Sequence, residues 1–291
     1  DHLDYHGNME DYALAKQQLF MQQNEQVCIF NANQDICWQW AQQLPRTKQV
    51  VFYGVNDLNV INNADQYVLA KDVQCHSKGV TFKLLTSWGE CDINSSLLGE
   101  FNVANLVAVI SVLLVQGHKL KDIAQYTDSL TAVTGRMEAF TGDNKATAVV
   151  DYAHTPDGLE KALQATRAHC HGDLWVVFGC GGDRDKGKRP MMGAIAGQYA
   201  DHIVLTNDNP RSEVATDITT DIQQGIKDLT KVNVIIDRKE AVVSALSRAQ
   251  ANDMVLLAGK GHEDYLLIGD KTIAYHEREV VRQFYQQGAQ L

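Results

Sequence analysis

Three short polar segments follow apolar runs and carry residue types that could bind a small charged ligand. Residues 179–190 read Gly-Cys-Gly-Gly-Asp-Arg-Asp-Lys-Gly-Lys-Arg-Pro, with charges of both signs among the glycines. Residues 207–211 read Asn-Asp-Asn-Pro-Arg, and residues 258–263 read Ala-Gly-Lys-Gly-His-Glu. Glycines allow the backbone to turn sharply or to approach a ligand closely, and the carboxylate of Glu263 could hold an ammonium group. Any one of these loops could equally be a solvated turn, because a short motif is only a hypothesis.

The elements before these segments place the loops at the ends of strands. Residues 174–178, 202–206 and 254–258 are apolar runs of strand length, which indicates strands buried on both faces. Helical segments between them complete a β/α alternation, which is typical of a parallel sheet with right-handed crossovers. The carboxyl ends of parallel strands meet at one edge, where ligands of α/β folds bind. We therefore expect the loops after residues 178 and 206 to form a candidate site.

The Gly-Lys-Gly turn after residues 254–258 is similar to part of a dinucleotide-binding fingerprint. The full fingerprint needs a third glycine and a long helix that starts directly after it, and this segment has neither. The pattern therefore disfavours a dehydrogenase.

Composition and charge exclude several classes of protein. The chain has 291 residues, a formal net charge of −10 and a pI of about 5.4, which argues against a nucleic-acid coat. A cluster of cations at 184–189 could still favour a phosphate ligand locally. No uncharged apolar stretch reaches the roughly 20 residues of a membrane span, and no basic, apolar leader is visible, so secretion is not expected. The six cysteines form no Cys-x-x-Cys pair, which indicates reduced thiols in a cytoplasmic protein.

The three polar segments, taken together and in this order, resemble the C-terminal domain of the Mur ligase family. The resemblance extends over essentially the whole chain and is strongest to members that add meso-2,6-diaminopimelate to UDP-N-acetylmuramoyl-L-alanyl-D-glutamate. It implies an ATP-dependent acid–amino-acid ligase that works through an acyl phosphate, with ATP and Mg²⁺ as cofactors. The implied role is peptidoglycan precursor synthesis, and hence cell-wall biogenesis, cell shape and cell division. The resemblance also implies a cytoplasmic monomer that binds neither nucleic acid nor membrane.

The resemblance implies an α/β fold, with part of a central parallel-sheet ATP-binding domain followed by a Rossmann-like α/β C-terminal domain. In the first part, residues 1–134, the alternating segments at 67–96 predict antiparallel hairpins at the sheet edge. The apolar segment 103–115 predicts a buried helix. Gly135 breaks local order, so we place the boundary there and assign residues 135–291 to the C-terminal, amino-acid-binding domain.

The same resemblance implies a metal site near the start of the chain. His2 and Lys16 match residues that the family uses in catalysis and in magnesium binding, and Lys16 matches a lysine that is carbamylated. Carbon dioxide converts an ammonium group, which cannot ligate a cation, into a carboxylate on a long arm, which can. Taken by itself, a lysine on an amphipathic helix is far more often a solvated surface group.

Four residues match the nucleotide-binding positions of the family: Asn102, Asn105, Arg136 and Asp151. Asn102 and Asn105 are three residues apart and thus on one helical face, although one could be an N-cap and the other a satisfied polar group. Arg136 would lie near the phosphates, where a permanently charged guanidinium is suitable, unless it only forms a salt bridge with Glu138. Asp151, at the end of a strand, would bind the ribose hydroxyls.

Seven residues match the diaminopimelate site of the family: Arg184, Asp208, Asn209, Pro210, Arg211, Gly259 and Glu263. The far end of diaminopimelate carries both a carboxylate and an ammonium group. Arg184 and Arg211 suit the carboxylate through bidentate contacts, whereas Glu263 and the carbonyl of Gly259 suit the ammonium.

The sequence departs from the family in one respect, because the phosphate-binding pattern Gly-x-x-x-x-Gly-Lys-[Ser/Thr] is absent. In the family this loop precedes the segment that this chain matches, so we expect the chain to be inactive alone. The alternatives are another ligase of the superfamily, such as folylpolyglutamate synthase, or a non-catalytic module that binds an amino acid. The Asp-Asn-Pro-Arg segment disfavours the first, and the presence of both the Lys16 motif and the His2 motif disfavours the second. Within the site, Arg211 could instead only tie its loop to Asp208 or Glu213.

Overall fold

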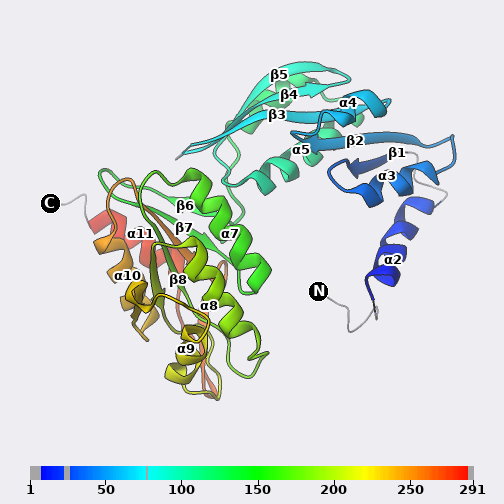
Figure 1. Cartoon of the computed structure of the whole chain (residues 1–291). Coiled ribbons are helices and arrows are strands. Elements are labelled where there is room, and N and C mark those ends of the chain that lie inside the picture. The colour runs from blue at the N-terminus through cyan, green and yellow to red at the C-terminus, as the bar shows by residue number, and fades with distance from the viewer. Residues whose placement is uncertain (1–7, 23–26, 77, 288–291) are drawn as a thin grey trace. The chain divides into compact units, whose positions relative to one another are not determined.

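The structure is a computed structural model, which describes residues 8–22, 27–76 and 78–287. The chain divides into two compact units (Figure 1). The first consists of Asp1–Gln74, Thr81–Ser95 and Glu100–Ser129, and the second consists of Cys75–Val80, Ser96–Gly99 and Leu130–Leu291. His2, one of the two residues assigned to magnesium, lies outside the described residues.

The first unit is built on a five-stranded sheet in the order β1-β2-β3-β4-β5. The strands are β1 (Val27–Asn31), β2 (Gln49–Val55), β3 (Tyr67–His76), β4 (Gly79–Thr86) and β5 (Gly89–Ser95). β1, β2 and β3 are parallel, whereas β4 and β5 are neighbours joined by two residues, the length of a tight hairpin. The sheet therefore has a parallel part and a hairpin edge.

The described part of this unit also contains helices before, between and after its strands. They are α2 (Met9–Met21), α3 (Asp35–Gln42), α4 (Asn59–Asn63), α5 (Glu100–Val115) and α6 (Leu120–Thr127). Trp38 of α3 stacks on Phe52 of β2 with ring centroids 3.8 Å apart, and its Nε1 donates to Ala32 O at 2.9 Å. These contacts fix α3 against the parallel part of the sheet.

The second unit is built on a six-stranded sheet in the order β10-β9-β8-β11-β7-β6. The strands are β6 (Glu138–Phe140), β7 (Thr147–Asp151), β8 (Leu174–Phe178), β9 (His202–Leu205), β10 (Val232–Val234) and β11 (Met254–Ala258). Neighbouring strands are parallel except β6 and β7, which are antiparallel. A separate antiparallel pair follows, β12 (Tyr265–Ile268) and β13 (Lys271–Ala274). The expected α/β fold with parallel sheets is confirmed.

Helices cover both faces of this second sheet (Figure 1). They are α7 (Pro156–His169), α8 (Lys188–Tyr199), α9 (Ala215–Gln223), α10 (Arg238–Arg248) and α11 (Glu277–Gln287). Val176 and Leu256 belong to the core formed with α7, α8 and α9, whereas Val177 and Leu257 belong to the core formed with α10 and α11. Every residue of β8 and β11 is buried, which explains why both strands are continuously apolar. Within the described residues of either unit, no helix is long and apolar enough to cross a membrane.

The register of the parallel strands determines where the polar loops leave the sheet. Asp151 at the end of β7 pairs with Ala258 at the end of β11, and Phe178 at the end of β8 pairs with Leu205 at the end of β9. Leu257 in turn pairs with both Val150 and Val177. The loops that follow these four strands therefore start side by side at one edge.

Candidate functional site

A cavity of about 350 Å³ lies where β7, β8, β9 and β11 end. Six of the seven residues assigned to diaminopimelate from the sequence line it, namely Arg184, Asp208, Asn209, Arg211, Gly259 and Glu263. The rest of the lining consists of Tyr152, His154, Thr155, Gly181 and Lys188. Pro210 is not among the lining residues. The fold thus brings residues that are more than 100 positions apart in the chain into one cavity.

The glycine-rich loop after β8 packs backbone against backbone on the loop after β9. A Cβ atom on Gly179 would lie 2.2 Å from Thr206 O, and one on Gly182 would lie 1.9 Å from Pro210 O. Gly182 N also donates to Asn209 O at 2.9 Å. These two glycines therefore serve a close approach between two chain segments, which no residue with a Cβ atom could make.

Arg211 is held by backbone carbonyls. Its Nη1 donates to Gly182 O at 2.9 Å and to Asn209 O at 3.4 Å, while its own amide donates to Leu267 O at 3.0 Å. Its φ of +51° is unusual for a residue with a side chain. The alternative that Arg211 ties its loop to Asp208 or Glu213 is wrong, because the described side-chain bonds of Arg211 go to carbonyl oxygens.

Glu213 binds two of the cations that the sequence offered as a phosphate-binding cluster. The guanidinium of Arg189, which is fully buried, donates to both oxygens of Glu213 at 2.8 and 3.0 Å, and Lys186 Nζ lies 3.0 Å from Oε2. The side-chain bonds from Arg189, followed by the amide of Asp183, lower the pKa of Glu213 to about 2. Lys188 Nζ donates to His154 O at 2.9 Å. Carboxylates therefore pair with Lys186 and Arg189, whereas Lys188 and Arg184, whose described bonds go to main-chain oxygens, keep their charge at the cavity wall.

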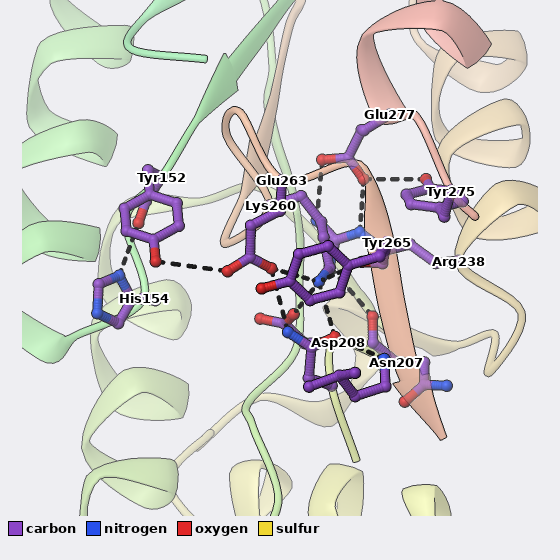
Figure 2. A network of polar contacts seen from close by, with 12 residues as sticks. Tyr152, His154, Asn207, Asp208, Arg238, Lys260, Glu263, Tyr265, Tyr275 and Glu277 are labelled. Carbon is purple, nitrogen blue, oxygen red and sulfur yellow. Dashed lines mark hydrogen bonds and ion pairs between the residues drawn. The ribbon is translucent and has the colours of Figure 1, made fainter. Parts of the chain in front are cut away.

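Lys260 is the centre of a buried polar cluster that sequence reasoning missed (Figure 2). Its side chain is fully buried. The four oxygens around Nζ are Asp208 Oδ1 at 2.9 Å, Glu263 Oε2 at 2.8 Å, Asn209 Oδ1 at 3.0 Å and Tyr265 O at 3.1 Å. The sequence gives one signal of this buried lysine, which is its place between two glycines directly after a fully apolar strand.

Glu263 uses its two carboxylate oxygens differently. Oε2 accepts hydrogen bonds from Lys260 Nζ and, at 3.1 Å, from Asn209 Nδ2. Among the described residues, the hydroxyl of Tyr152 alone donates to Oε1, through a long bond of 3.4 Å. Burial, followed by the charge of Glu263, raises the pKa of Tyr152, so this hydroxyl stays a donor. Oε1 is thus the oxygen with capacity for a ligand.

Arg238 ties the chain that follows β9 to the end of β11 (Figure 2). This buried side chain donates through Nη1 to Asn207 O at 3.1 Å and through Nη2 to Ala258 O at 2.9 Å. Its charge is paired with Glu277, which also accepts from Tyr275 OH at 3.0 Å. Burial, the largest single effect, would lower the pKa of Arg238, but the charge and hydrogen bonds of Glu277, together with nearby acidic groups, outweigh burial and raise it. The pair holds the chain immediately before Asp208 and Gly259.

Asp151 and Arg136, both assigned to the nucleotide, lie near Tyr152 in the second unit. Asp151 accepts from Met137 N at 2.9 Å and from Ala153 N at 2.8 Å, and burial raises its pKa in spite of these bonds. The Cζ atom of Arg136 lies 4.7 Å from the centroid of the Tyr152 ring. The alternative that Arg136 pairs with Glu138 is wrong, because Glu138 binds Arg278 at 2.6 and 3.0 Å.

The other assigned residues lie in the first unit. Lys16 is exposed on α2, with Nζ 4.8 Å from the centroid of the Tyr12 ring. Asn102 and Asn105 lie on α5, where Asn105 Nδ2 donates to Asn102 Oδ1 at 3.3 Å. Because α5 begins at Glu100, neither asparagine is its N-cap, which corrects that alternative.

Comparisons with known proteins match the two parts of the chain to two domains of one family. A model of the Mur ligase middle domain matches residues 1–113, and a model of the Mur ligase glutamate ligase domain matches residues 135–261. UDP-N-acetylmuramoyl-L-alanyl-D-glutamate–2,6-diaminopimelate ligases from two strains of Haemophilus influenzae are 45% identical over 284 residues. The match covers 98% of this chain but only 57% of those relatives, so the chain spans little more than half of their length.

Two solved structures have a fold similar to that of this chain. A structure of a UDP-N-acetylmuramoyl-L-alanyl-D-glutamate–2,6-diaminopimelate ligase is 37% identical, with a TM-score of 0.73 over 99% of this chain and 58% of that chain. A folylpolyglutamate synthase from Thermotoga maritima is 17% identical, with a TM-score of 0.65 over 97% of this chain and 59% of that chain. The second similarity shows a shared fold only.

Proposed function

Because the chain belongs to the Mur ligase family, we propose that it is part of an ATP-dependent ligase for an amino acid with a charged far end. The acceptor is UDP-N-acetylmuramoyl-L-alanyl-D-glutamate, the added amino acid is meso-2,6-diaminopimelate, and the product is a cytoplasmic precursor of peptidoglycan. The observation that carries this proposal is the charge pattern of the 350 Å³ cavity, where Arg184 and Arg211 face the same space as Asp208 and Glu263. The names of the relatives support the choice of amino acid.

The charge pattern matches the two ends of an amino acid. One end of diaminopimelate reacts, and the other end carries a carboxylate and an ammonium on the same carbon. Arg184 and Arg211 are suited to the carboxylate, because a guanidinium can donate two parallel hydrogen bonds. Glu263 Oε1 is suited to the ammonium, because its only described donor is the long bond from Tyr152. L-Lysine has the same chain without the far carboxylate and would leave the arginines unpaired.

The cavity would contribute to amide formation by binding the amino acid and orienting its reactive amine. Forming an amide from a carboxylate and an amine in water is uphill, so a phosphoryl group from ATP must first activate the carboxylate of the UDP-linked substrate. The amine then attacks the acyl phosphate, the amide bond forms, phosphate leaves and the amine loses a proton. Residues that hold the far end of the amino acid present the near amine at a fixed position, which lowers the entropic part of the barrier.

We also propose that Asn102 and Asn105 in the first unit, and Arg136 and Asp151 in the second, bind the nucleotide. The ring contact between Arg136 and Tyr152, a residue of the cavity wall, supports this assignment because it brings a phosphate-binding cation near the amino-acid site. A nucleotide bound there would supply the phosphoryl group.

Magnesium would be held by carbamylated Lys16 together with His2. The exposed position of Lys16 on α2 leaves its amine open to carbon dioxide. Across the described ranges 8–22, 27–76 and 78–287, no group of three or more His, Cys, Asp or Glu side chains could hold a metal ion. The described side chains therefore do not make a complete site, and the magnesium proposal rests on the resemblance.

The test is a ligase assay with the complete ligase that contains this chain, ATP and the UDP-linked dipeptide. The amino acids supplied are meso-diaminopimelate, L-lysine, D-alanine and L-glutamate. We expect product and stoichiometric phosphate release with meso-diaminopimelate, and much lower catalytic efficiency with the other three. A preference for L-glutamate with a folate acceptor would instead support a folylpolyglutamate synthase, and binding of diaminopimelate without phosphate release would support a non-catalytic module.

A further inference from the structure

Lys260 has four oxygen partners and no exposure to solvent. A buried ammonium is costly unless it is paired and hydrogen-bonded, and here its partners include the two carboxylates that face the cavity, Asp208 and Glu263. We propose that Lys260 is a positioning residue for the ammonium-binding end of the cavity. It holds Asp208, Asn209 and Glu263 at fixed spacing and leaves one uncompensated negative charge for the ammonium of the ligand. This inference rests on the proposed function.

The backbone around Lys260 shows why its side chain points inward. The flanking residues Gly259 and Gly261 have φ values of +111° and +50°, in the region that favours glycine. A Cβ atom on Gly259 would also lie 2.9 Å from Asp208 Oδ2. The two glycines let the chain reverse direction tightly after β11, which places Nζ between the loop after β9 and the start of β12. The same turn lets Asp208 approach the backbone.

The charges of the cluster do not cancel. Asp208 and Glu263 both lie within 2.9 Å of one ammonium group, so an ionised cluster has one negative charge in excess. Asn209 adds an amide that accepts from Lys260 through Oδ1 and donates to Glu263 through Nδ2. This arrangement directs Oε2 of Glu263 to protein groups and leaves Oε1 toward Tyr152 and the cavity. The excess charge therefore lies where a ligand ammonium would restore neutrality.

The nearby buried Arg238 provides a contrast within the same part of the fold. Arg238 has a single carboxylate partner, Glu277, and its remaining described bonds go to main-chain oxygens. Neither residue lines the cavity. Arg238 thus forms a neutral structural pair, whereas Lys260 acts on carboxylates that a ligand can reach.

Other ionisable side chains surround the Lys260 cluster and must be considered in any pH experiment. Tyr152 donates to Glu263, and the ring of Tyr265 has its centroid 5.6 Å from Lys260 Nζ. Arg238 and Cys180 interact electrostatically with Asp208. The remaining ionisable residues of the cavity wall are His154, Arg184, Lys188 and Arg211.

The first test measures steady-state kinetics of Lys260→Met and Lys260→Gln in the complete ligase. We expect KM for meso-diaminopimelate to rise by roughly 10-fold or more in Lys260→Met, because two carboxylates lose their shared counter-charge. KM for ATP should stay within about twofold, since Lys260 and its two carboxylate partners do not contact the proposed nucleotide residues directly. Lys161→Met, which removes an exposed lysine paired with the exposed carboxylate of Asp157, is the matched control and should leave both constants unchanged.

The pH profile separates positioning from a merely structural role. Without Lys260, two neighbouring carboxylates are expected to share a proton, since like charges in one site disfavour ionisation. KM for the amino acid should therefore fall more steeply with rising pH in Lys260→Met than in wild type. Lys260→Gln keeps a donor but not the charge, so its KM for the amino acid should lie between those of wild type and Lys260→Met, and it should retain the steeper profile.

A second measurement needs no substrate. If the carboxylates of folded Lys260→Met hold a proton more tightly than in the unfolded chain, their contribution to stability is present at low pH and lost as pH rises. The drop in Tm relative to wild type should thus be larger at about pH 8 than at about pH 6. Adding Glu263→Gln removes one of the two carboxylates and should relieve this drop.

The outcomes decide the two proposals separately. A KM for meso-diaminopimelate within about twofold of wild type, or a parallel rise in KM for ATP, would overturn the positioning role of Lys260. A wild-type ligase that accepts no diaminopimelate would refute the proposed function. In that case the Tm comparison still decides on Lys260, because an equal drop at both pH values would contradict the charge argument.

Discussion

Gly182 and Pro210 are in direct contact, since a Cβ atom on Gly182 would lie 1.9 Å from the carbonyl oxygen of Pro210. The amide of Gly182 also donates to Asn209 O at 2.9 Å. Asn209 and Arg211, on either side of Pro210, both line the cavity. The contact therefore sets the distance between the two loops that supply most of the charged residues of the site.

Gly182→Ala should push the two loops apart. The new methyl group would meet a backbone carbonyl, which cannot rotate away as a flexible side chain could. Overpacking of this kind costs about 1–3 kcal/mol of stability, and we expect a higher KM for the amino acid. Gly197→Ala in α8 is the control, because its Cβ would have 3.5 Å to the nearest atom and alanine is the better helix former. Equal behaviour of the two variants in urea unfolding and kinetics would contradict the packing argument.

Arg211→Ala should reduce the preference for meso-diaminopimelate over L-lysine. The two amino acids differ in the far carboxylate, and leaving a charge unpaired in a binding site costs roughly 2–5 kcal/mol. Overall activity should also fall, since Arg211 Nη1 holds Gly182 O. The diagnostic quantity is therefore the ratio of kcat/KM for the two amino acids. Lys186→Ala removes a cation of the same region that pairs with Glu213 and should leave the ratio intact. An unchanged ratio in Arg211→Ala would exclude a selectivity role.

Glu277→Gln should destabilise the second unit strongly. The substitution leaves the buried guanidinium of Arg238 without its counter-charge, and breaking such a pair costs roughly 3–5 kcal/mol. Because Arg238 also holds Asn207 O and Ala258 O, weaker amino-acid binding should accompany the loss. Glu279→Gln, in the same helix but half exposed, should change the free energy of unfolding by at most about 0.5 kcal/mol. Comparable losses in the two variants would show that the pair is not structural.

Glu213→Gln should change how the free energy of unfolding depends on pH in the acid range. In the folded chain the pKa of Glu213 is held at about 2, below its ordinary value of 4.5. A depressed pKa contributes stability that is present above the ordinary value and is lost as pH falls towards the folded value. The stability difference between wild type and variant should therefore shrink as pH falls from about 4.5 to about 2. Asp157→Asn, at an exposed ion pair, should leave this pH dependence unchanged. If the stability difference between wild type and Glu213→Gln stays constant over this pH range, the link between the pKa of Glu213 and stability is disproved.

Lys16→Ala in the complete ligase should abolish ligation, with partial rescue by added short carboxylates that replace the carbamate oxygens. Mass spectrometry of the intact wild-type protein, kept with magnesium and bicarbonate, should show one added carbon dioxide that the variant lacks. Lys121→Ala removes another exposed lysine of the first unit and should keep full activity. Full activity of Lys16→Ala would remove Lys16 from the mechanism.

The sequence was sufficient for the parallel sheet of the second unit and for the place of the site. Apolar runs at 174–178 and 254–258 are local signals of buried strands, and parallel strands necessarily share the edge at which they end. The glycines of 179–182 also marked a close approach, although the sequence could not show that the partner is the loop at 206–210 rather than a ligand.

Only the tertiary structure decided which charges pair. Glu213 was a candidate partner for Arg211 and Glu138 for Arg136, yet Glu213 binds Arg189 and Glu138 binds Arg278. Lys260 and Arg238 carried no strong signal, because a buried charge is recognisable only when its partners are known. The physical reason is range: strand and turn preferences arise from neighbouring residues, whereas an ion pair depends on distances of a few ångströms between segments brought together by the whole fold.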